Sequence, residues 1–180
     1  MNGLRTEDFP LVTKAREVFF RAMNEGGYAI GAPPNPIAGI PGAKGHIFEC
    51  KDFWGAWQVI DCWISQRRGC QSAGWTLILL NRSPVWQMTY HGAYPDHLLP
   101  LLRLALRTNY AAQRFLGGRG SPELADKELG VRYVNRTDPA QDFMSFSGEE
   151  VIEEIPRVTT STATRLGWHR FQGHFMASPV

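Results

Sequence analysis

The chain has 180 residues, of which 43% are hydrophobic and 20% charged, and its formal net charge is +2. This length and composition fit one soluble globular domain, spanning residues 1–180, with a sizeable core. The small net charge and the scattered arginines argue against nucleic acid as a partner. No apolar run approaches the roughly 20 residues that a membrane-spanning helix needs.

The sequence carries no sign of export or of a bound cofactor. Acidic residues occupy the place where a signal peptide would have an apolar core. Three cysteines, Cys50, Cys62 and Cys70, have spacings that fit neither a disulfide framework nor a Cys-x-x-Cys site. The chain has no phosphate-binding loop, dinucleotide fingerprint or zinc-protease motif. We therefore expect a cytoplasmic protein without a metal or cofactor.

The expected elements run helix, strands, helix, strands. Apolar residues at three- and four-residue steps predict an amphipathic helix at about 10–25, which Gly26 and Gly27 end. A second helix is expected at 96–115, with Pro100 in its first turn. A proline- and glycine-rich loop follows the first helix, at 31–42. Strands are expected at 46–51, 57–65, 75–81, 85–92, 131–135, 142–146, 149–155 and 165–176, and the polar stretch 158–164 as a mobile hairpin or edge strand.

Two segments share a pattern. Residues 72–94 and 147–175 both pass from a small-residue turn through a strand to an aromatic-x-Gly ending, with Tyr90 and Gly92 corresponding to Phe171 and Gly173. Such repetition is typical of a duplicated supersecondary unit. The predicted fold is therefore α+β. Its mainly antiparallel sheet is built from two related repeats, at about 45–115 and 130–177, with an N-terminal helix and a central helix between the repeats.

The same segments resemble the bacterial DUF5680 family. The resemblance lies in residues 60–63, in 73–74 and in the segment 84–92, which begins Pro-Val-Trp and ends Tyr-His-Gly. It continues in residues 117–122, 146–152 and 171–173, and covers most of 10–177. The family has no established activity that the resemblance could carry over to this chain. Some members resemble the appended domain of helix-turn-helix regulators, which implies a sensing role.

Strand alternation divides the side chains between two faces of the sheet. One face is apolar, and we expect Trp86, Met88 and Tyr90 to be buried there together with Cys62 and Ile64. The other face combines aromatic and polar side chains, which is typical of a groove that binds a small ligand. The candidate ligand-binding residues are Asp61, Trp63, Gln87, Thr89, His91, Trp168 and Arg170, with Arg119 approaching from a glycine-rich loop.

A small-ligand-binding or sensing module is the best interpretation of these residues. Arginines beside an aromatic platform favour a planar or sugar-like ligand with an anionic group. A different class of function is a small enzyme in which Asp61 and His91 perform acid–base chemistry. A third is a protein-interaction domain that docks a partner through the loop 31–42. A solvated sheet face with no ligand also stays open, as does a homodimer.

Overall fold

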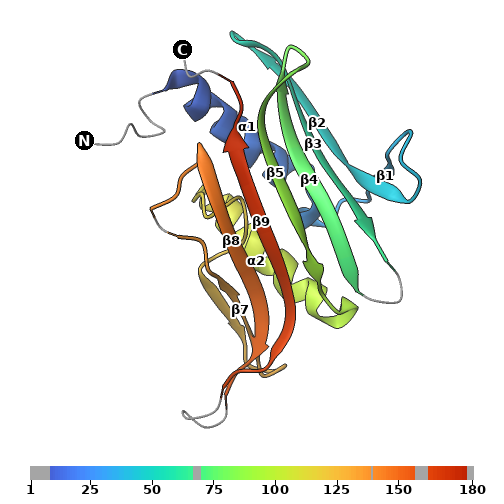
Figure 1. The fold of residues 1–180 in the computed structure, drawn as a ribbon, viewed down its shortest axis with the longest axis vertical. Helices are drawn as coiled ribbons and strands as arrows, with labels where there is room; N and C mark the ends of the chain where they lie inside the picture. Colours follow the sequence, from blue (N-terminus) through green and yellow to red (C-terminus); the bar gives the residue numbers. More distant parts are fainter. Residues whose placement is uncertain (1–8, 67–69, 139, 157–161, 178–180) are drawn as a thin grey trace.

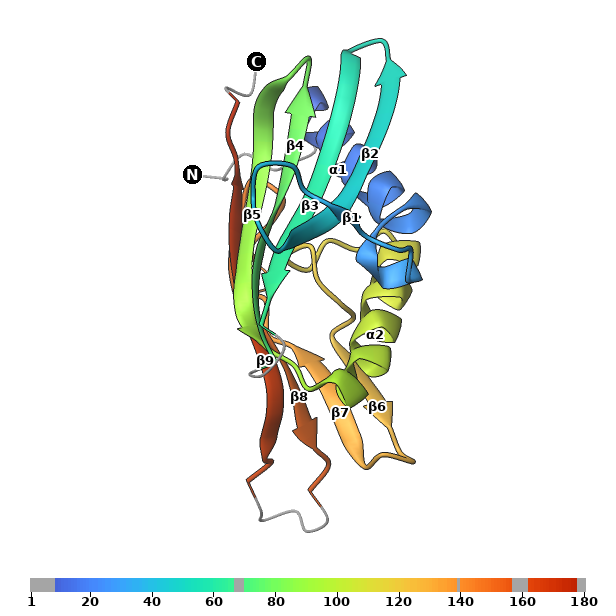
Figure 2. The same cartoon turned by 90° about the vertical axis from the view of Figure 1, so that its right-hand side faces the viewer.

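The computed structural model describes residues 9–66, 70–138, 140–156 and 162–177. Across these ranges nine strands form one antiparallel sheet, and two α-helices lie along one of its faces (Figures 1 and 2). The α+β class predicted from the sequence is confirmed. The stretch expected at 158–164 falls largely outside the described residues.

Both α-helices cover the sheet with one apolar side. Helix α1 spans Pro10–Glu25 and α2 spans Leu99–Ala111; short 3-10 turns lie at Tyr28–Ile30 (η2) and Asp96–Leu98 (η3). Each α-helix has a proline in its first turn, where the missing N–H would have no helical partner. The buried positions of α1 recur every three or four residues, because only one side of the helix meets the sheet.

The strands form two meanders that meet in the middle of the sheet. The order is β1-β2-β3-β4-β5-β9-β8-β7-β6, so the last strands of the two halves, β5 and β9, pair with each other. The first meander, of five strands, follows α1 in the chain, and the second, of four strands, follows α2. The strands are β1 (Asn35–Pro36), β2 (Ala43–Asp52), β3 (Gly55–Ser65), β4 (Gln71–Leu80), β5 (Ser83–Ala93), β6 (Glu123–Asp126), β7 (Val131–Asn135), β8 (Ser145–Glu154) and β9 (Arg165–Phe175).

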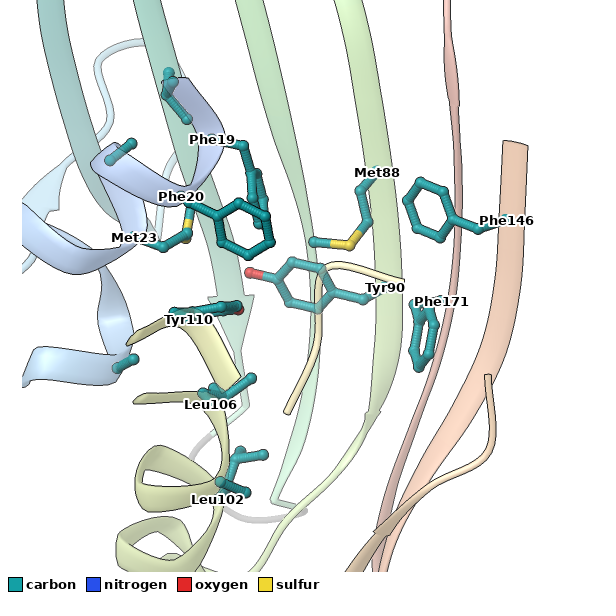
Figure 3. Packing of buried hydrophobic residues seen from close by; sticks show 14 of the residues in the cluster. Phe19, Phe20, Met23, Met88, Tyr90, Leu102, Leu106, Tyr110, Phe146 and Phe171 are labelled. Carbon is teal, nitrogen blue, oxygen red and sulfur yellow. The ribbon is translucent and has the colours of Figure 1, made fainter. Parts of the chain in front are cut away.

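The register shows which side chains share a face. Asp61 pairs with Thr76, Thr76 with Met88, and Met88 with Gly173, so this row of residues points to one face across four strands. We call this the helix face, because Met88 and Tyr90 extend from it toward α1 and α2 (Figure 3). The opposite side of the sheet is the outer face.

The core lies between the helix face and the two α-helices. Trp86 is fully buried there, and its ring stacks on Phe143 with a centroid distance of 4.8 Å. Its indole N–H donates to the Phe143 carbonyl at 3.0 Å, so the one polar atom of this side chain is paired. Phe19 of α1 packs against the same indole at 5.4 Å. The predicted burial of Trp86, Met88 and Tyr90 is therefore confirmed.

Two expectations about individual residues need correction. Cys62 is buried as expected, but on the outer face, and Ile64 on that same face is 43% exposed. Their strand was assigned to the wrong face, because Asp61 and not Cys62 shares a row with Met88. Of the strand expected at 142–146, residues 143–144 form a turn, to which the Asp142 side chain is hydrogen-bonded, and only Ser145 and Phe146 belong to a strand, the start of β8.

Candidate functional site

A cavity of about 680 Å³ lies between the helix face and α2, within the range of pockets that hold small molecules. Its walls come from β3, β4, β5, β9, α2 and the segment 28–34 that follows α1. Figure 3 shows part of this region, where the Tyr90 hydroxyl points from β5 toward Phe20 and Tyr110. The apolar and aromatic lining comprises Met23, Tyr28, Ala29, Trp63, Met88, Tyr90, Tyr94, Leu99, Leu102, Leu106 and Tyr110.

Asp61 is a buried carboxyl group in the wall of the cavity. One of its oxygens, Oδ1, accepts hydrogen bonds from the Thr76 hydroxyl at 3.0 Å and the Tyr90 hydroxyl at 3.3 Å. Burial raises the pKa of Asp61 above its ordinary value, and the Thr76 hydrogen bond and the positive charge of Arg119 only partly oppose this effect. The environment of Asp61 thus favours its neutral, hydrogen-bond-donating form more than water does.

Arg119 forms the second polar group of the cavity, and it is 6% exposed. It comes from the glycine-rich segment after α2, which the Asn109 amide holds by donating to the Arg119 carbonyl at 2.7 Å. The guanidinium group lies over the Tyr90 ring, 5.2 Å from its centroid. Its Nη2 donates to Glu150, whereas its Nε is buried and has no hydrogen-bond partner among the described residues.

A buried network behind Arg119 fixes its position. Glu150 is completely buried and accepts a second hydrogen bond from the Tyr133 hydroxyl at 2.5 Å. Burial alone would raise the pKa of Glu150, but the charge of Arg119, with hydrogen bonds from His169 and Arg119, lowers this pKa to about 2. Glu150 is therefore a carboxylate at neutral pH and the counter-charge of Arg119.

His169 completes the network from β9. Its Nε2 lies 3.0 Å from the Ser72 hydroxyl, and its Nδ1 lies 3.3 Å from the Glu150 carboxylate. Burial lowers the pKa of His169, although its hydrogen bond to Glu150 acts in the opposite direction. A neutral ring with the proton on Nδ1 satisfies both contacts, since Nδ1 then donates to Glu150 and Nε2 accepts from Ser72.

Exposed residues mark the opening of the cavity. The start of the proline-rich loop, at 31–34, lies along this opening, and the Ala32 carbonyl is 2.9 Å from His46 Nε2. Arg103 of α2 lies over the Tyr28 ring at 4.9 Å, and Lys44 lies 6.0 Å from the centre of Trp63. The loop 31–42 is thus attached to the domain beside the cavity, where Asn35–Pro36 also pairs with β2.

The sheet separates the predicted site residues into two groups. Asp61, Trp63 and Arg119 line the cavity together, as expected for these three. The others belong to the outer face: Thr89, His91 and Arg170 line a separate, more open groove of about 570 Å³, Trp168 contacts His91 edge-on, and Gln87 lies beside His174.

The expectation that Asp61, Trp63, Gln87 and His91 line one concavity, with Arg119 and Arg170 at its edge, is therefore wrong. The physical reason is again the register: His91 pairs with Ala73 and Ala73 with Ile64, so His91 lies on the opposite side of the sheet from Asp61. Sequence reasoning also missed Tyr90, Thr76 and His169 as cavity residues. The alternation along β5 and β9 had placed Tyr90 and His169 on the apolar face, and this was the signal that could have found them.

Comparison of the chain with protein-family models, curated proteins and solved structures finds no match. In the described ranges, no three histidine, cysteine or acidic side chains lie together in a way that could hold a metal ion. None of the helices there is long and apolar enough to cross a membrane. Cys50, Cys62 and Cys70 are free thiols.

Proposed function

We propose that the protein binds a small molecule in the cavity between the sheet and α2, in a ligand-binding or sensing role. The observation that carries this proposal is a cavity of about 680 Å³ with largely apolar walls and a few buried polar side chains, Asp61 and Arg119 among them. An apolar surface supplies contact area, and a few polar groups of fixed position orient a ligand. Trp63 offers a flat surface for stacking at the end of β3.

The support for the alternatives is weaker. Asp61 and His91 lie on opposite faces of the sheet, so they cannot act as an acid–base pair on one substrate. The loop 31–42 pairs with β2 and borders the cavity, which suits a part of the binding site better than an arm for a partner protein. Membership of the DUF5680 family and a cytoplasmic location remain proposals that agree with a sensing role.

The relation between the two halves of the chain is an inference of the same kind. It is supported by the order of elements, since in each half an α-helix precedes a meander, of five strands in the first half and four in the second, whose last strand lies at the centre of the sheet. Under this inference the cavity lies under the β3–β5 part of the first repeat and is completed by Arg119 from the segment between the repeats and by His169 from the second repeat.

A cavity-filling substitution tests the proposed function. Leu106 lines the cavity and is 2% exposed, whereas Leu104 on the same helix is 41% exposed and outside it. In a thermal-shift screen of small metabolites, a ligand of the native protein raises the melting temperature. Leu106→Trp should abolish that rise, and the matched control Leu104→Trp should retain it. Binding that persists unchanged in a folded Leu106→Trp protein would contradict the proposal.

The same screen separates the two faces. Trp63→Ala should weaken binding at least tenfold, because it removes an aromatic wall of the cavity. His91→Ala should leave binding unchanged, because His91 belongs to the outer groove. If His91→Ala weakens binding and Trp63→Ala does not, the ligand binds on the outer face and the proposal is wrong.

A further inference from the structure

Arg119 has more hydrogen-bond donors than the protein uses. A guanidinium group carries five N–H donors and no acceptor. In the described part of the chain, Nη2 donates a hydrogen bond to Glu150 and lies 3.2 Å from His169 Nδ1, which carries its own proton and accepts no hydrogen bond. The Nε–H is buried without a partner, in a side chain that is 6% exposed and lines the cavity. A buried donor without a partner is costly, so a ligand that supplies an acceptor gains affinity there.

Asp61 is the second polar side chain whose hydrogen bonding bears on the ligand. Its Oδ1 is already engaged by two hydroxyl donors, Thr76 and Tyr90. Burial raises the pKa of Asp61, and in its protonated form Asp61 would supply a further O–H donor to a ligand oxygen. The donor that the geometry itself leaves unused at the polar end of the cavity is Arg119 Nε.

The cations at the opening of the cavity favour an anionic ligand. Lys44 and Arg103 lie there, whereas the acidic lining residues are Asp96 and Asp61, and Glu150 balances the charge of Arg119 inside the cavity. Each of the three cations also lies over an aromatic ring of the lining: Lys44 over Trp63, Arg103 over Tyr28 and Arg119 over Tyr90. A ligand-borne cation placed beside one of these rings would therefore be repelled by the protein's own cation.

Resting on the proposed function, we propose that the ligand is a hydrophobic organic acid. Its apolar body lies against the aromatic and leucine walls, and its carboxylate accepts hydrogen bonds from Arg119 at the closed end of the cavity. Lys44 and Arg103 attract the anion at the opening. A carboxylate is the natural partner of a guanidinium group, because charge-assisted hydrogen bonds are about twice as strong as neutral ones.

Three probes with one body and different head groups test this inference. They are 2-naphthoate, 2-naphthylmethanol and 2-naphthylmethylamine, titrated into the protein by calorimetry at pH 7.5 and low ionic strength. We expect the acid to bind at least tenfold more tightly than the alcohol, and the amine to bind most weakly. An alcohol or amine that binds as tightly as the acid overturns the inference.

Substitutions at the two ends of the cavity locate the effect. Arg103→Gln should weaken binding of 2-naphthoate severalfold without affecting 2-naphthylmethanol; the control Arg107→Gln, exposed on the same helix, should alter neither. Arg119→Lys keeps a cation beside Glu150 but removes Nε, so the preference for acid over alcohol should fall at least fivefold. If Arg119→Lys does not fold, Arg103→Gln and its control Arg107→Gln decide the test. An Arg103→Gln protein that loses as much affinity for the alcohol as for the acid contradicts the inference.

The inference and the proposed function fail in different ways. If the alcohol binds as tightly as the acid and Leu106→Trp abolishes this binding, the cavity is still a binding site. The inference that its ligand is an organic acid is then refuted. If none of the three probes binds, both statements fail for hydrophobic ligands of this size. Acid binding that survives in a folded Leu106→Trp protein places the anion site elsewhere and overturns both.

Discussion

Removing one partner of the ion pair between Arg119 and Glu150 should be among the most destabilising single changes in this domain. Replacing Glu150 with glutamine keeps the shape of the side chain but leaves the buried Arg119 without a counter-charge. Removing one partner of a buried pair costs about 3–5 kcal/mol. The pKa gives a similar figure, because a drop from 4.5 to about 2 corresponds to roughly 3 kcal/mol in favour of the folded, ionised state.

The pH dependence has a definite sign. A carboxylate whose pKa is lowered by folding stabilises the native state above its unfolded pKa of 4.5, and the stabilisation is lost as the pH falls toward about 2. Urea unfolding followed by tryptophan fluorescence should therefore show Glu150→Gln about 3–5 kcal/mol less stable at pH 7. The difference from the natural protein should narrow as the pH falls below 4.5.

Two further variants complete this experiment. Glu154→Gln, at an exposed position of the same strand, should change the free energy of unfolding by less than about 0.5 kcal/mol. The double variant Arg119→Met with Glu150→Gln should cost clearly less than the sum of the two single changes, because no unpaired charge stays buried. A loss below about 1 kcal/mol for Glu150→Gln, or strict additivity in the double variant, would refute the reasoning.

Three other predictions concern the core and the repeats. Trp86→Ala should destabilise the domain by about 3–5 kcal/mol in denaturant melts, because a fully buried indole leaves a large void; a loss under about 1 kcal/mol would contradict its placement. Gly92→Ala should lower the melting temperature by several degrees, since the new Cβ would lie 2.0 Å from the Trp168 carbonyl oxygen, whereas Gly26→Ala meets no atom within 4 Å and should be nearly neutral. An experimental structure should superpose the two halves with Gly92 on Gly173, and unrelated positions for these glycines would exclude a duplication.

The sequence predicted the elements of this fold better than their faces. Helix α1 and the strands β2 to β5 follow from local periodicity, which depends only on neighbouring residues. The relative facing of β3 and β5 depends on β4 between them, through the pairs of Asp61 with Thr76 and of Thr76 with Met88. Periodicity within one strand does not contain this register. Without this register, the prediction placed Asp61 and Trp63 on the outer face, whereas they lie on the helix face.

The candidate site was predicted only in part for the same reason. Arg119 was expected near Asp61 because the glycines around it free its loop, and the two residues do line one cavity. Glu150 and His169, by contrast, resemble ordinary polar residues of a strand. They meet Arg119 from 31 and 50 residues away, so no local spacing indicates the buried network. Gly148 was interpreted as a break between two strands, at 142–146 and 149–155. In the structure it lies within β8, where the absence of a side chain leaves room for the Phe171 ring.

The pairing of β5 with β9 has a consequence for how the chain folds. Within each meander every strand pairs with its neighbour in the sequence, so these pairs close short loops. The central pair instead joins residues 86–93 to 168–175 and closes the longest loop in the sheet. We expect the two meanders to form first and their docking along this pair to limit the folding rate. The cavity, which needs Arg119 and His169 against β3 to β5, would be among the last features of the native state to form.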